Sequence, residues 1–147
     1  MAARGDNSVL TFDVAKLMSK NTSTVNASFL GSVSSDGTAP VGMVLFSNGR
    51  LLAVANSNRF NDPDGTSSLV VFDVRSRLPQ KKAELNIPPM SEVPSTFNHH
   101  DISSPDNGYL STFPRNVEVG DDGTTLYVTK FVASEVMVVD TRVTRGP

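Results

Sequence analysis

Short runs of apolar and β-branched residues, separated by polar turns, recur along this 147-residue chain. Runs of about four to eight residues whose side chains alternate between two faces are typical of β-strands. Asn48-Gly49 and Asp122-Gly123 each lie between two such runs and predict the turn of a β-hairpin. A helical turn is expected at 15–20, and loops at 1–8 and 88–113. The pattern predicts an all-β chain, with strands at 9–14, 27–33, 41–46, 51–56, 69–74, 82–87, 116–119, 125–129 and 136–140.

The two hairpins belong to a longer internal repeat. Placing Pro40 on Pro114, an offset of 74 residues, aligns them without a gap. A third strand matches three times, as VLTFD ending at Asp13, LVVFD ending at Asp73 and VMVVD ending at Asp140. Both faces of these strands are apolar, which fits a sheet packed between two neighbouring sheets. A supersecondary unit that recurs at this scale favours a propeller or a solenoid.

Two segments of the chain resemble the YVTN-type repeat of the lactonase-like seven-bladed β-propellers. They read PVGMVLFSNGRLLAVANSN, and FPRNVEVGDDGTTLYVTKF followed by VMVVD. They share with the repeat a Pro that opens the inner strand, an Asp/Asn-Gly turn, a Leu-x-Val second strand and a third strand ending in Asp. Lys130 follows LYVT where an Asn is usual, whereas the first copy keeps that residue as Asn56. The resemblance covers nearly the whole chain and implies a partial β-propeller.

The register of the resemblance implies a single partial propeller domain over 1–147. Residues 9–33 would form the third and outer strands of one blade, 40–87 a full blade, and 114–141 the first three strands of the next. The expected fold is therefore one full four-stranded blade plus two incomplete blades. Two interpretations of the open blades follow: a fragment of a longer propeller, or a chain that self-associates through its open blade edges.

Composition removes several classes of function. Thirteen basic and 15 acidic residues give a net charge of −2, which provides no electrostatic basis for binding nucleic acid or an anionic membrane. The absence of cysteine excludes disulfides, thiol catalysis and Cys-zinc sites. No apolar run approaches the ~20 residues of a membrane-spanning helix, and no signal peptide is visible at the N-terminus. The compartment stays open, and no cofactor is indicated.

Candidate chemistry lies in two polar segments, 57–68 and 88–113, which alternating strand direction places on one face of the blades. His99-His100-Asp101 could supply a general base or a metal ligand, although a solvated loop is the favoured interpretation. Because the chain has two histidines and no cysteine, a metal site would need carboxylates such as Asp62 or Asp64, and none is predicted. The segment NDPDG at 61–65 resembles part of a calcium loop but lacks its first and last ligands, so a turn is favoured.

The remaining candidates are polar residues beside these segments. Asn56, Arg59, Asp62 and Asp64 are candidate ligand-binding residues. Arg115 follows the Pro that opens an inner strand, so it could point toward a central channel, although a surface position is favoured. The aspartates that end the third strands, Asp13, Asp73 and Asp140, recur once per repeat, which favours turn capping over catalysis.

Three functional hypotheses follow. The favoured one is a binding or scaffold module that holds a protein or small-molecule ligand through loops on one face. The alternative implied by the resemblance is a lactonase-like hydrolase acting on a sugar or muconate lactone. Its base would be His99 or His100, and Arg59 or Arg115 would hold the developing oxyanion. The third is a truncated, non-functional fragment of such a protein.

Overall fold

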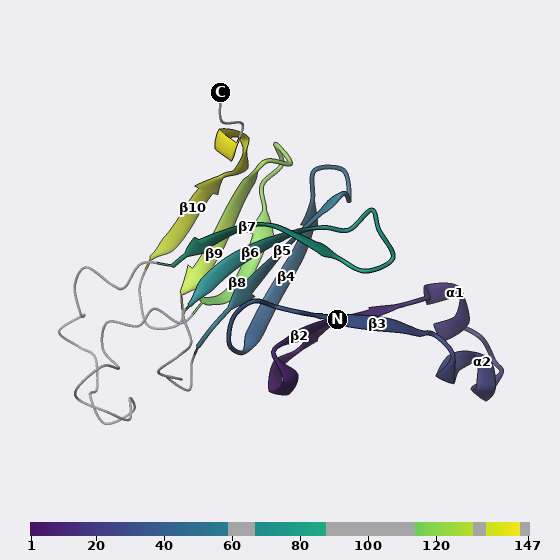
Figure 1. The fold of residues 1–147 in the computed structure, drawn as a ribbon. Coiled ribbons are helices and arrows are strands. Elements are labelled where there is room, and N and C mark those ends of the chain that lie inside the picture. The colour runs from purple at the N-terminus through teal and green to yellow at the C-terminus, as the bar shows by residue number, and fades with distance from the viewer. Residues whose placement is uncertain (59–66, 88–113, 131–134, 145–147) are drawn as a thin grey trace.

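Three antiparallel β-sheets stack on one another in the computed structural model, which describes residues 1–58, 67–87, 114–130 and 135–144 (Figure 1). The all-β prediction is confirmed, as is the arrangement of one four-stranded sheet between two incomplete ones. The first sheet contains β1 (Ala2–Ala3), β2 (Ser8–Phe12) and β3 (Phe29–Ser34), in that order. The second contains β4 (Pro40–Phe46), β5 (Leu51–Asn56), β6 (Ser68–Asp73) and β7 (Gln80–Asn86). The third contains β8 (Pro114–Val119), β9 (Thr125–Lys130) and β10 (Val136–Asp140).

Short helices occupy the connection between β2 and β3. Asp13 caps α1 (Val14–Leu17) by accepting a hydrogen bond from the backbone N–H of Lys16, and Asn21 caps α2 (Thr22–Asn26) in the same way. In the described parts of the chain, 3₁₀ turns occur at η1 (Arg4–Asp6) and η3 (Thr141–Thr144). Among the described residues, no helix has the length and apolarity needed to cross a membrane.

The predicted hairpins are confirmed, and their turns differ in how they are stabilised. In the β4–β5 turn, Ser47, Asn48 and Gly49 all have positive φ, a conformation that glycine and asparagine adopt at little cost. In the β8–β9 turn, Asp122 accepts hydrogen bonds from the N–H groups of Thr124 and Thr125, at 2.9 and 2.8 Å. The hydroxyl of Thr125 donates a third, at 2.6 Å. These hydrogen bonds hold the pKa of Asp122 well below its usual range.

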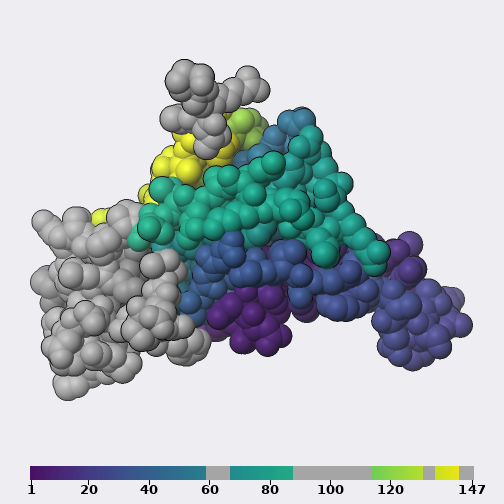
Figure 2. Space-filling model, viewed as in Figure 1, coloured from purple at the N-terminus to yellow at the C-terminus, as the bar shows by residue number. Residues whose placement is uncertain are grey.

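The central strands of the second sheet, β5 and β6, are buried on both faces, as their apolar pattern predicts. Alternate residues of β5 and β6 belong to two different cores because successive side chains of a strand point to opposite faces. The core against the first sheet contains Val9, Leu52, Val54, Val70 and Phe72. The core against the third sheet contains Phe46, Ala53, Ala55, Leu69, Ile87, Val117, Leu126 and Val128. Figure 2 shows β6 and β7, in teal, between the first sheet in purple and β10 in yellow.

The second and third sheets are closest at their first strands, β4 and β8, and diverge toward the other edge. A Cβ on Gly42 of β4 would lie 2.8 Å from the Cα of Asn116 of β8, so the two backbones approach too closely for a side chain there. Toward the other edge, residues of β6, β7 and β10, together with Phe46, Leu51 and Leu126, line a cavity of about 610 Å³. The distance between the second and third sheets thus increases from β4 and β8 toward β7 and β10.

Candidate functional site

Both candidate segments leave the second sheet at the same end of its strands, and we call this end of the sheets the loop edge. The last residue of β5, Asn56, pairs with the first residue of β6, Ser68, and Ser68 pairs in turn with Asn86 at the end of β7. The hairpin turn at 47–50 lies at the other end of the strands, which we call the turn edge. The prediction that 57–68 and 88–113 emerge on one face is therefore confirmed for the strand ends that flank them (Figure 1).

A buried hydrogen-bond network supports the loop edge, and Asn56 is at its centre. The side-chain amide of Asn56 donates to the backbone oxygen of Ser35, at 2.9 Å, and to the hydroxyl of Ser68, at 3.1 Å. All three residues are fully buried. Ser35 in turn donates from its hydroxyl to the backbone oxygen of Gly37, at 3.0 Å. Because a buried polar group without a partner is destabilising, these hydrogen bonds favour the observed position of the β3–β4 connection against β5.

The connection between β3 and β4 lies directly over this network. A Cβ on Gly37 would lie 2.6 Å from the Cγ of Asn56, so the close packing leaves no room for a side chain. The backbone N–H groups of Ser57 and Asn58 donate to the oxygens of Ala39 and Thr38, at 3.0 and 2.9 Å. The start of the 57–68 segment is thereby fixed to the connection that joins the first and second sheets.

One atom of the network differs from the rest. The side-chain oxygen Oδ1 of Asn56 is buried and has no hydrogen-bond partner among the described residues. Asn56, predicted from the sequence as a candidate ligand-binding residue, is 0% exposed and supports the loop edge from inside the fold. The sequence could not reveal this, because the residues that cover Asn56 precede it by about 20 positions.

The third sheet carries a charged pair at the corresponding position. Lys130 pairs with Pro114 as Asn56 pairs with Pro40, and Glu135 directly precedes β10 where Ser68 begins β6. The ammonium of Lys130 lies 3.4 Å from the carboxylate of Glu135. The Lys130 side chain is only 6% exposed, whereas that of Glu135 is 53% exposed. An ion pair in the third sheet thus replaces the amide–hydroxyl hydrogen bond of the second.

Arg115 is the described member of the candidate catalytic set. β4 and β8 each open with a fully buried proline followed by an irregularity in pairing, at Pro40/Gly42 and at Pro114/Asn116. Arg115 is the extra residue of the second irregularity and is exposed at the loop edge. The other predicted site residues, Arg59, Asp62, Asp64, His99, His100 and Asp101, lie outside the described residues.

Metal binding has no support in the part of the chain that the structure describes. No group of three or more His, Cys, Asp or Glu residues is placed to hold a metal ion there.

No model of a known protein family matches this chain, and no curated protein matches it. The likeness to YVTN-type propellers therefore stays a prediction from the residues quoted above.

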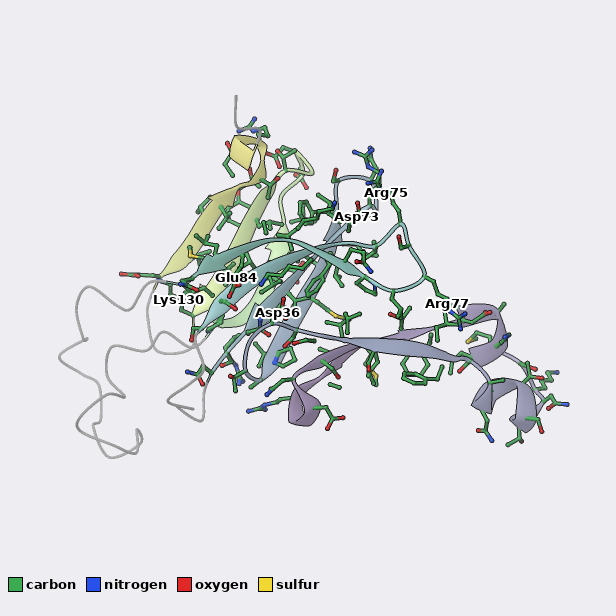
Figure 3. The ribbon with its side chains drawn as sticks, in the orientation of Figure 1. Asp36, Asp73, Arg75, Arg77, Glu84 and Lys130 are labelled. Carbon is green, nitrogen blue, oxygen red and sulfur yellow. The ribbon has the colours of Figure 1, made fainter. Side chains whose placement is uncertain are left out.

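At the turn edge, Asp73 and Asp140 cap their turns, as predicted, whereas the third of these aspartates, Asp13, caps the helix α1. Asp73 accepts hydrogen bonds from the backbone N–H and the guanidinium of Arg75, and Asp140 does the same with Arg142. Figure 3 shows Asp73 and Arg75 together, at the opposite end of the sheets from Lys130. The arginine side chain, then the backbone N–H, lowers the pKa of each aspartate, to about 2 for Asp140. The pattern Asp-x-Arg, at 73–75 and 140–142, is a sequence signal from which these pairs could have been predicted but were not.

Proposed function

We propose that the chain is part of a β-propeller of the YVTN type and acts as a binding or scaffold module through its loop edge. The observation that carries the binding proposal is the buried network of Asn56, Ser35 and Ser68 beneath the strand ends from which both long polar segments leave. Segments that a rigid scaffold presents on one face are where binding residues concentrate. The partner would be a protein or a small-molecule ligand.

The propeller part of the proposal draws support from the way the sheets are stacked. In a propeller, blades converge on a central channel at their inner strands and separate toward their outer strands. Here β4 and β8 lie side by side, and a cavity separates β7 from β10. The second sheet is also covered on both faces by apolar neighbours, as a blade between two blades requires.

Binding rather than hydrolysis is proposed because of what the described part of the loop edge contains. The described part of the loop edge contains the buried amide of Asn56 and the buried hydroxyls of Ser35 and Ser68. These groups hold the backbone in place and do not act as an acid or a base there. Lys130 is engaged by Glu135, so it also serves the architecture of the edge. Arg115 is exposed at the same edge, where its side chain lies within reach of a partner's acidic or polar groups.

A matched pair of arginines tests the proposal. Peptides would first be selected from a displayed random library against the whole chain, and their affinities measured by biolayer interferometry. Arg115→Ala, at the loop edge, is expected to weaken peptide binding by about fivefold or more. Arg50→Ala, at the exposed turn edge, is expected to leave it unchanged within about twofold.

Two results would overturn the proposal. One is a set of peptides whose affinity falls with Arg50→Ala and not with Arg115→Ala, which would place binding at the turn edge. The other is hydrolysis of glucono-1,5-lactone by the whole chain, followed in a pH-stat and lost when His99 and His100 are both replaced by Ala. That outcome would support the lactonase-like alternative.

A further inference from the structure

The outward face of the third sheet, the face turned away from the second sheet, carries exposed apolar side chains. Tyr127 of β9 and Val138 of β10 are directly opposite each other in the strand register. They are 42% and 61% exposed, and Val136, two residues before Val138, is 54% exposed. On the opposite face, Leu126 and Val128 of β9 are completely buried against the second sheet, and Met137 and Val139 of β10 are half-buried there. The β9–β10 part of this sheet therefore carries apolar side chains on both faces but is covered on only one, and Glu118 of β8, the register partner of Tyr127, is exposed beside it on the outward face.

The second sheet shows what normally covers such a face. Val136 and Val138 correspond in register to Leu69 and Val71 of β6, because Asp140 corresponds to Asp73 and both strands pair identically with their neighbours. Leu69 is 2% exposed, because the third sheet packs on it through Leu126 and Val128. Within the chain, residues at this register are therefore covered by the next sheet, through the face of that sheet that points back toward them.

The first sheet carries apolar residues at the complementary register, the half-buried Phe12 and the exposed Phe29. Phe12 corresponds to Phe72 and to Val139, which face the preceding sheet in the second and third sheets. Its ring lies 5.6 Å, between centroids, from that of Phe29, its partner in the strand register, and Phe29 is 51% exposed. Ser32 of β3 pairs with Leu10 and lies on this same face, because Val9, the neighbour of Leu10, is buried against the second sheet.

We propose that the outward face of the third sheet binds the outward face of the first sheet of a second copy of this chain. This contact would repeat, between copies, the packing that already joins the sheets twice within the chain. Val136 and Val138 of one copy take the role of Leu69 and Val71, and Phe12 of the other takes the role of Val139. The interface is head-to-tail, so each copy uses two different faces, and the assembly closes into a ring or extends.

This proposal uses different surfaces from the loop edge and does not depend on the proposed function. Light scattering coupled to size-exclusion chromatography, over a series of protein concentrations, measures the mass in solution. Wild-type protein is expected to exceed the mass of one chain, and Val138→Glu and Phe29→Glu each to reduce the mass toward one chain. Met18→Glu is the matched control, because Met18 is an apolar residue, 77% exposed, beyond α1 and outside both sheet faces.

Mixing variants distinguishes head-to-tail association from other arrangements. Val138→Glu retains an intact first-sheet face and Phe29→Glu an intact third-sheet face, so the mixture is expected to recover a two-chain species. Circular dichroism establishes that each variant is folded. Should Phe29→Glu fail to fold, engineered cysteines give the same information, because the chain has none of its own. Val138→Cys and Ser32→Cys are then expected to form a disulfide with each other.

Three outcomes would overturn the proposal. Wild-type protein with the mass of one chain at every concentration excludes self-association. A reduction of mass by Val138→Glu but not by Phe29→Glu assigns the contact to two third sheets facing each other. A Val138→Cys variant that forms disulfides with itself as readily as with Ser32→Cys leads to the same conclusion.

Discussion

Asn56 donates a hydrogen bond to the backbone oxygen of Ser35, 21 residues earlier in the chain, and thereby connects β5 to the segment that joins the first two sheets. The same amide reaches Ser68 of the neighbouring strand. The Asn56 side chain thus joins β5, β6 and the connection between β3 and β4 by hydrogen bonds.

Replacement of Asn56 by Ala is expected to destabilise the fold by about 1–3 kcal/mol, because the backbone oxygen of Ser35 and the hydroxyl of Ser68 both lose a buried partner. Urea unfolding followed by circular dichroism measures the free energy. Asn86→Ala is the matched control, since Asn86 is exposed at the same edge, and a change within about 0.5 kcal/mol is expected there. Equal effects of the two substitutions would contradict the assigned role of Asn56.

Replacement of Gly37 by Ala is expected to destabilise the fold by about 1–3 kcal/mol through overpacking. The new Cβ would lie 2.6 Å from the Cγ of Asn56, and buried Asn56 has no open space into which to move. Gly5→Ala is the control, because nothing lies within 4 Å of a Cβ there. The two variants can be compared by their midpoints of urea unfolding. A stable Gly37→Ala variant would show that the connection between β3 and β4 can move away from β5.

The strands and hairpins could be predicted because their signals are local. Alternating apolar residues define strands, and the dipeptides Asn48-Gly49 and Asp122-Gly123 mark turns whose backbone geometry few other residues adopt. Every predicted strand has a counterpart in the structure. The repeat of Pro40 on Pro114 also predicted that β4 and β8 are equivalent, and the structure adds an irregular pairing after each proline that the sequence did not predict.

What the sequence did not predict depends on contacts between distant segments. β1 was expected to be a loop, because Ala2-Ala3 has no alternating apolar pattern, and its strand conformation follows from pairing with β2. α2 was not expected either, since its propensity is low and the capping Asn21 looks like an ordinary loop residue. Asn56 looked like a surface residue at a strand end, because its covering segment is remote in sequence.

The ion pair between Lys130 and Glu135 is expected to contribute about 0.5–1 kcal/mol to stability, because Lys130 is nearly buried while its partner is exposed. Glu135→Gln should lower the free energy of unfolding by that amount in wild-type protein. In a Lys130→Met background, Glu135→Gln should have little effect, because no cation remains to be paired. High salt should reduce the difference between the two backgrounds. Equal effects of Glu135→Gln in both backgrounds would show that the pair makes no net contribution.

The pairing of Asp140 with Arg142 is expected to make stability depend on acid pH. The hydrogen bond from the Arg142 side chain, and then that from its backbone N–H, lowers the pKa of Asp140 from 3.8 to about 2 in the folded chain. A carboxyl whose pKa is lowered by folding stabilises the fold fully above its unfolded pKa, and that contribution is lost as pH falls through the folded pKa. The advantage of wild-type protein over Asp140→Asn should therefore shrink between about pH 4 and pH 2.

Titration of the Asp140 carboxyl carbon by NMR tests this assignment directly. Arg142→Gln removes the side-chain donor and the positive charge but keeps the backbone N–H, so the pKa of Asp140 should move up toward 3.8 without reaching it. Arg75→Gln, at the equivalent position of the second sheet, should raise the pKa of Asp73 in the same way and leave that of Asp140 unchanged. An Asp140 pKa that stays near 2 in Arg142→Gln would mean that the backbone of the turn alone stabilises the carboxylate.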